Sequence, residues 1–122
     1  MNSAITTKNR ARRRLFSLLV IATFAGAASI ASSQSLSVEI SGGRVKGDET
    51  LKVRQGDQVQ VRFLSDKPII LHLHGYDLDV KVVPPAPAFL NFKAKMAGRF
   101  PMHEHRTGAG NHRAVLFIEV YP

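Results

Sequence analysis

The chain has 122 residues, which is enough for one domain. It contains no cysteine, and this excludes disulfide bonds, thiol catalysis, zinc sites built on cysteine, and blue copper sites with a thiolate ligand. The formal net charge is +8, but five of the 17 basic residues lie before residue 15. The others are scattered, without runs or interleaved aromatic residues, so we expect no nucleic-acid partner.

Residues 1–33 have the pattern of a secretory signal peptide. Five positive charges at positions 8–14 precede an apolar run at positions 15–28, and small residues follow. This order of charged, apolar and small residues is typical of a segment that is removed during export. We expect cleavage after Ala31 or Ser33.

We expect residues 34–122 to form the mature domain, with a net charge of +3 once the five N-terminal charges are removed. The domain would be periplasmic or secreted, and it would not contact a membrane after signal cleavage. An uncleaved N-terminal anchor is the alternative, although the apolar run is shorter than the ~20 residues of a membrane span. Arg13 and Arg14 resemble a twin-arginine signal, so the export route stays open between that system and the general secretory one.

Apolar and polar residues alternate with a period of two after residue 34, which is typical of half-buried strands. No segment carries a sustained helical stripe. The proline-rich segment 84–87 cannot join a central ladder, so it must be a connection. The expected strands, in chain order, cover residues 36–40, 51–53, 59–63, 69–74, 78–82, 89–94, 98–103 and 114–120.

These strands predict an all-β protein, a Greek-key β-sandwich of seven to eight strands. Segment 69–74 is mostly apolar, as is typical of a buried strand. The alternation also predicts which side chains form the core: Val59, Val61, Phe63, Leu116, Ile118 and Val120.

The histidines carry the most informative chemistry. His72 and His74 form one cluster, His103 and His105 form a second, and His112 follows seven residues later. Residues i and i+2 of a strand point to the same face, so each cluster can present two imidazoles side by side. Histidine is the commonest metal ligand among side chains, so the two clusters predict a metal site if the fold brings them together.

Residues 36–122 resemble a small exported bacterial cupredoxin-like domain. Residues 50–59 are similar to the early strand-turn-strand of that family, and residues 98–105 are similar to its closing strand and ligand loop. Gly108-Ala109-Gly110 resembles the glycine-rich ligand loop of plastocyanin-like proteins. The resemblance implies a cupredoxin-like sandwich that holds a metal at the loops next to the closing strand.

The metal motif departs from the family's pattern. His72 and His74 compete for the place of the first histidine ligand, and His105 stands where the second would be. Met102 occupies the place of the copper-ligating cysteine, and His112 lies near the place of the axial methionine. Without a thiolate, the trigonal blue-copper geometry cannot form, so fast electron transfer of that type is not expected.

A copper ion is the expected cofactor, with zinc as the alternative. Imidazole suits Cu(II), imidazole with thioether suits Cu(I), and three histidines with an open position form a known zinc arrangement. The leading set is a histidine trio completed by a methionine or a fourth histidine. The candidate metal ligands are His74, His105 and His112, then Met102 or His72, and His103.

Each candidate also has a plainer interpretation. His72 and His74 could simply be hydrogen-bonded at the rim of the sandwich, and methionine is more often core filler than ligand, which applies to Met102. Asp77 and Asp79 alternate with apolar residues and indicate a solvated strand face.

We therefore expect an exported protein, not an enzyme, that binds copper or a similar metal through histidines for carriage or sequestration. Its partners would be the metal ion and a periplasmic metal-handling or redox protein. The first alternative is a metal-free interaction module with a cupredoxin fold, and the second is an atypical electron-transfer protein. Convergence of His74, His105 and His112 would favour metal binding over the metal-free module.

Overall fold

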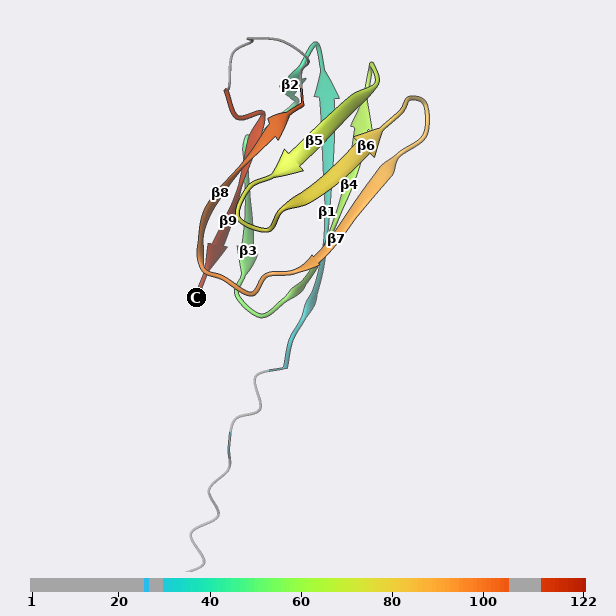
Figure 1. Cartoon of the computed structure of the whole chain (residues 1–122). Helices are drawn as coiled ribbons and strands as arrows, with labels where there is room; N and C mark the ends of the chain where they lie inside the picture. Colours follow the sequence, from blue (N-terminus) through green and yellow to red (C-terminus); the bar gives the residue numbers. More distant parts are fainter. Residues whose placement is uncertain (1–25, 27–29, 106–112) are drawn as a thin grey trace, which may run out of the picture.

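The computed structural model describes residues 26, 30–105 and 113–122, and these form two β-sheets (Figure 1). Within these residues no helix has the length and apolar character needed to cross a membrane. Most of the predicted signal peptide lies outside the described residues.

The first sheet has four strands in the order β2-β1-β4-β7. Strand β1 pairs antiparallel with β2 and parallel with β4, and β4 pairs antiparallel with β7. The bounds are β1 Ser33–Ser41, β2 Arg44–Val45, β4 Gln58–Ser65 and β7 Ala88–Lys93.

The second sheet has five strands in the order β3-β9-β8-β5-β6. Strand β9 pairs parallel with β3 and antiparallel with β8, and β5 pairs antiparallel with both β8 and β6. The bounds are β3 Thr50–Arg54, β5 Ile69–Leu73, β6 Leu78–Val82, β8 Gly98–Glu104 and β9 Leu116–Tyr121.

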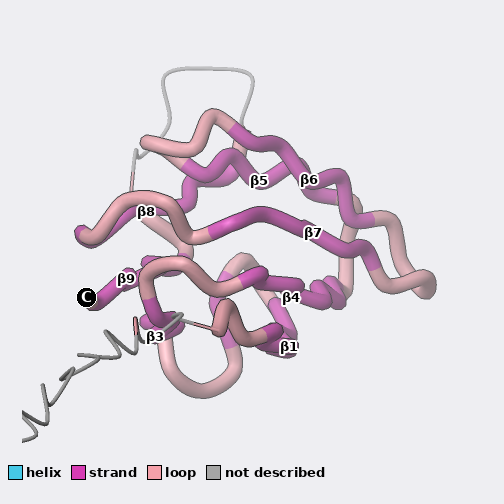
Figure 2. Tube along the Cα trace, turned by 90° about the horizontal axis from the view of Figure 1, so that it is seen from below, coloured by secondary structure: helices cyan, strands magenta, loops and turns pink. Residues whose placement is uncertain are grey.

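The two sheets pack face to face, and Figure 2 shows β5 and β6 in one layer and β1 and β4 in the other. This arrangement confirms the predicted all-β sandwich. The described strands number nine because the two-residue β2 joins the eight that the alternation predicts. The predicted core is confirmed as well, since each of its members is at most 2% exposed: Val59, Val61, Phe63, Leu116, Ile118 and Val120.

Strand β5 differs from its prediction as a buried strand. Ile69, Leu71 and Leu73 point into the core, but Ile70 is 39% exposed and His72 lies on the same outer face. Sheets built mainly from antiparallel pairs commonly have one face on the core and one toward solvent, and β5 follows that rule despite its apolar composition. Its outer face is therefore available for a site.

Candidate metal centre

The outer face of β5 carries the first histidine cluster. The strand alternates, so the neighbours Leu71 and Leu73 are fully buried while His72 and His74 point away from the core. The two imidazole rings have centroids 4.6 Å apart and meet edge to face. Burial of the leucines thus fixes the direction in which the histidines point.

Strand β8 brings the second cluster against the first. His103 is the register partner of His72, and the backbone N–H of His105 donates a 2.8 Å hydrogen bond to the carbonyl of Ile70. The ring centroids of His74 and His103 are 4.7 Å apart, and those of His72 and His105 are 5.3 Å apart. Four of the predicted ligands therefore form one continuous imidazole cluster, although they come from strands far apart in the sequence.

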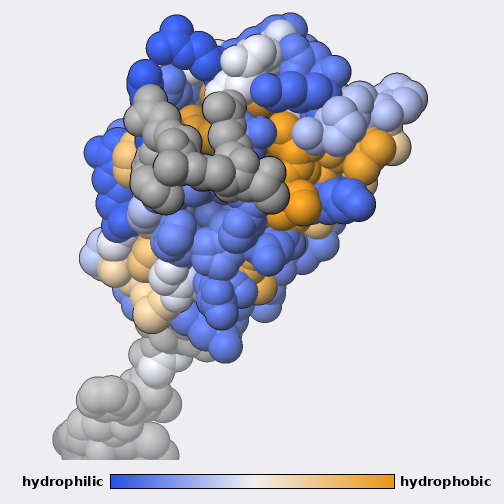
Figure 3. Space-filling view, turned by 45° about the horizontal axis from the view of Figure 1, so that its top comes forward, coloured by the Kyte–Doolittle hydropathy of each residue, from blue (hydrophilic) through white to orange (hydrophobic). Residues whose placement is uncertain are grey.

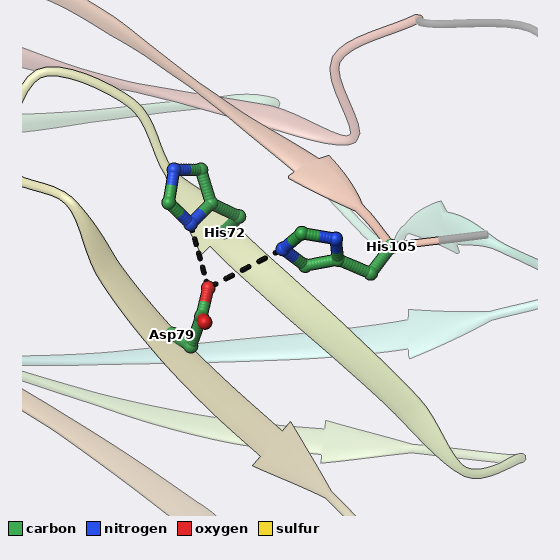
Figure 4. A group of neighbouring side chains, drawn as sticks. All are labelled: His72, Asp79 and His105. Carbon is green, nitrogen blue, oxygen red and sulfur yellow. Dashed lines mark hydrogen bonds and ion pairs between the residues drawn. The ribbon is translucent and has the colours of Figure 1, made fainter. Parts of the chain in front are cut away.

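Strand β6 adds carboxylates to the imidazoles. Asp79 is the register partner of His72, and its Oδ1 accepts a 2.6 Å hydrogen bond from His72 Nδ1. The same oxygen lies 3.4 Å from His105 Nε2, so the carboxylate sits between the two rings (Figure 4). Asp77 Oδ1 lies 3.5 Å from the other ring nitrogen of His72. His72 is thus flanked by a carboxylate at each nitrogen.

The electrostatics of this group favour a charged carboxylate. The hydrogen bond from His72 lowers the pKa of Asp79 below its ordinary value, and the positive charges that His72 and His105 can carry act in the same direction. Asp79 therefore stays anionic at neutral pH, which is the form that can coordinate a cation.

The turn between β5 and β6 positions His74 and Asp77. Gly75 adopts a φ of 85°, and a Cβ atom there would overlap the ring of Phe100. Tyr76 packs edge to face against Phe100, with ring centroids 4.9 Å apart, and its hydroxyl exchanges two 3.1 Å hydrogen bonds with the backbone of Met96. Glycine is required here because the backbone is left-handed and the aromatic ring lies directly against it.

Met102 lies on the other side of the sheet from the imidazoles. It pairs with Leu73, is fully buried, and belongs to the hydrophobic core, whereas its neighbour His103 pairs with His72. The thioether therefore does not reach the histidine cluster in this structure. His112, the last candidate ligand, lies outside the described residues.

Asp79 is the member of the group that sequence reasoning missed. The alternation of Asp77 and Asp79 with apolar residues indicated a solvated strand face, and Asp79 does lie on such a face. The sequence feature that could have identified Asp79 is its position in the strand directly after the His72-Leu73-His74 segment. A hairpin places that strand beside the histidines.

His72, Asp79 and His105 form a group that could hold a metal ion, since one ligand atom from each lies within 4.8 Å of the others. Bonds of about 2.0–2.2 Å would bring such atoms to about 3.5 Å from one another, which small side-chain rotations can supply. Two imidazoles with a carboxylate suit Cu(II) or Zn(II), whereas Cu(I) prefers softer sulfur ligands. The group is open to solvent, because the side chains of Asp79 and His105 are 61% and 57% exposed.

The surface seen from the upper end of the sandwich is mostly hydrophilic, and apolar residues show only in separate areas (Figure 3). The exposed large apolar residues belong to several different elements, among them Ile70 on β5, Phe89 on β7 and Tyr121 on β9. On the face that Figure 3 shows, polar and ionisable side chains cover most of the described surface.

Comparisons with known proteins give structural likenesses only. No family model matches the sequence, and a comparison with curated protein sequences also gave no match. A chain of a heme-copper terminal oxidase dimer is 21% identical with a TM-score of 0.64, and the match covers 78% of this chain and 68% of that one. A copper binding protein, solved by NMR in its apo form, is 13% identical with a TM-score of 0.58, covering 73% and 88%.

Auracyanin A, a blue copper protein from Chloroflexus aurantiacus, is 12% identical with a TM-score of 0.57, and the match covers 73% of this chain and 99% of that one. At these identities the likeness concerns the fold alone. It confirms the architecture that the sequence resemblance implied.

Proposed function

Since this chain has a cupredoxin-like fold but contains no cysteine, we propose that it is an exported protein that binds copper, or a similar metal, through histidines. The proposed ligands are His72, Asp79 and His105, and the role is metal carriage or sequestration rather than catalysis. This set keeps two of the histidines that the sequence suggests and adds the carboxylate of β6.

The observation that carries the proposal is the meeting of His72, Asp79 and His105 on one face of the second sheet. A cluster of imidazoles that only satisfied local hydrogen bonds would not need two rings turned toward the same carboxylate oxygen. The rings of His74 and His103 continue the cluster on the other side of His72.

The openness of the group supports carriage over catalysis. Asp79 and His105 are more than half exposed, so a bound ion could be reached and exchanged by the ligands of another protein. Chemistry on a bound substrate usually takes place at a site that is closed to water, whereas these two side chains are open to solvent. A periplasmic metal-handling or redox protein is the partner that fits this exposure.

Export remains part of the proposal and rests on the N-terminal sequence pattern, with cleavage after Ala31 or Ser33. The chain would then act in the periplasm or outside the cell. The absence of cysteine throughout the chain means that no disulfide bond would form in an oxidising compartment.

The test is isothermal titration of the protein with Cu(II), Cu(I) and Zn(II), alongside the variants His72→Ala, Asp79→Asn and His105→Ala. We expect one ion per chain, and a loss of affinity of about 10-fold or more for each variant, because each removes a ligand. Cu(II) should bind more tightly than Cu(I), since the thioether of Met102 is buried away from the group.

The matched control is Asp66→Asn, which removes another exposed carboxylate that also accepts hydrogen bonds but lies on the connection after β4. It should leave metal affinity unchanged. If the wild-type chain takes up no metal at micromolar concentration, the metal-free interaction module replaces this proposal. If it binds but the three substitutions have no effect, the ion is held elsewhere.

A further inference from the structure

The beginning of β1 contacts a buried acidic side chain. Asp57 ends the tight turn between β3 and β4 and is only 4% exposed. Its Oδ1 accepts a 3.2 Å hydrogen bond from the backbone N–H of Ser32. Its Oδ2 is buried and has no hydrogen-bond partner.

Within the described part of the chain, no side chain neutralises this carboxyl group. Among residues 30–105 and 113–122, no lysine, arginine or histidine lies within ion-pair distance of Asp57. Burying a carboxylate that has one long hydrogen bond and no cation is costly. A positive charge beside the Asp57 carboxylate would offset this cost.

Backbone hydrogen bonds hold both Ser32 and Asp57 in place. The N–H of Gln58 donates a 2.9 Å hydrogen bond to the carbonyl of Ser32, and the N–H of Ala94 donates a 2.9 Å hydrogen bond to the carbonyl of Asp57. Immediately before Ser32 the chain leaves the sheet, since Ile30 is 90% exposed and Ala31 is exposed as well. The Ala31–Ser32 peptide bond thus lies where a protease could reach it, and its own nitrogen donates the hydrogen bond to Asp57.

We propose that export processing cleaves the Ala31–Ser32 bond, and that the new α-ammonium group of Ser32 forms an ion pair with Asp57. Water adds across the peptide bond under catalysis by a signal peptidase, leaving a carboxylate on Ala31 and an amine on Ser32. Ser29 and Ala31 supply the small residues that such peptidases require at the third and first positions before the cut.

The positive charge created by cleavage would stabilise the buried carboxylate of Asp57. One amide N–H becomes an ammonium group with three donors, which can serve Oδ1 and also the unpartnered Oδ2. Cleavage after Ser33, the other expected position, would remove Ser32 and with it both the N–H and the carbonyl that now bind the β3–β4 turn.

The first test is the N-terminal sequence and intact mass of the protein recovered from an exporting host that expresses the full-length chain. A mature chain beginning at Ser32 is expected. A chain beginning at Gln34, or recovery of the uncleaved chain, would overturn the proposal.

The second test measures the coupling between the amine and the carboxylate in that recovered protein. The α-amine can be acetylated selectively near pH 6.5, because its ordinary pKa of about 7.7–8.0 lies far below that of lysine. Acetylation keeps the N–H but removes the charge. We expect acetylation and Asp57→Asn each to lower the melting temperature, and their combination to lower it by less than the sum of the two shifts.

Asp66→Asn is the matched control, because Asp66 binds Ser41 and Gly42 at the far end of β1. Its effect should be the same with a free and an acetylated amine. Purely additive shifts for Asp57→Asn would mean that no ion pair forms. If Asp57→Asn does not fold, the wild-type protein still decides: the stabilisation lost on acetylation must be fully present at pH 6 and must decline as the pH rises above about 8, through the pKa of the amine that the ion pair raises.

Discussion

Among single residues, Phe63 contributes most clearly to the core. It is fully buried on β4 and lies between the two sheets. We predict that Phe63→Ala lowers the free energy of unfolding by about 3–5 kcal/mol, because it removes a large apolar side chain and leaves a cavity. Denaturant unfolding followed by circular dichroism measures this change.

Phe89 provides the control for that substitution. It lies on β7, in the same sheet, but its side chain is 50% exposed. Phe89→Ala should change the free energy of unfolding by about 0.5 kcal/mol or less. Equal losses in the two variants would contradict the arrangement of the sheet described here.

The residues of the candidate centre show where sequence reasoning reaches its limit. The alternation of β5 identified His72 and His74 as neighbours on one face. It did not identify Asp79 as their partner, because the register between β5 and β6 depends on the conformation of the turn. That turn contains a left-handed residue, Asp77 with φ 54°, whose backbone conformation no alternation pattern encodes.

At the scale of elements, the β5–β6 turn is the part on which the candidate centre depends most. We predict that Gly75→Ala lowers the free energy of unfolding by about 2–4 kcal/mol, because a methyl group there is strained by the positive φ and also overlaps Phe100. Metal affinity should fall with it, since the turn positions Asp77 and sets the register of Asp79. Titration calorimetry and denaturant unfolding on the same sample measure both effects.

Substitution of Gly42 tests the effect of backbone strain separately from the effect of overlap with Phe100. It also has a positive φ, of 59°, but a Cβ atom there would meet nothing within 4 Å. Gly42→Ala should therefore cost only the backbone strain, about 1 kcal/mol, and leave metal binding unchanged. A Gly75→Ala effect no larger than that of Gly42→Ala would show that the packing against Phe100 has no energetic weight.

The turn after β1 depends on pH through Asp66. The backbone N–H of Gly42 and the hydroxyl of Ser41 donate hydrogen bonds to its carboxylate at 2.8 and 3.0 Å, and they lower the pKa of Asp66 from its ordinary value of 3.8. A carboxyl group whose pKa is lowered by folding stabilises the native state above its unfolded pKa and loses that effect as the pH falls through the folded pKa. Asp66→Asn should therefore reduce stability at pH 7.

The pH dependence of the melting temperature tests whether the carboxylate charge of Asp66 causes this loss of stability. The difference in melting temperature between the wild-type chain and Asp66→Asn should be constant from about pH 7 to about pH 5 and should then shrink as the pH falls below about 4. A difference that persists at pH 2 would mean that the substitution acts through something other than the carboxylate charge.

The fold as a whole could be predicted from the sequence more completely than the candidate centre. Period-two alternation in Val59, Val61 and Phe63 identifies one face of one strand without knowledge of its partners, and most strands follow the same rule. The meeting of His72 with His105 requires β5 to pair with β8, which is not its neighbour along the chain. Only the resemblance to cupredoxin-like domains pointed to that pairing.

For the whole molecule, the lack of cysteine has a direct spectroscopic consequence. We predict that the Cu(II) form is pale, without an intense thiolate-to-copper absorption in the visible range, because that band requires a Cu–S(Cys) bond. Electron paramagnetic resonance should show coordination by imidazole nitrogens. An intensely blue protein would refute the ligand set proposed here.

The position of β9 determines when the molecule can fold. Residues 116–121 lie between β3 and β8, and β3 has no other partner in its sheet (Figure 1). The second sheet therefore cannot be completed during synthesis until residues 116–121 have left the ribosome. Up to that moment β3, β5 and β8 stay without a complete sheet, and their long-range pairings form late and slowly.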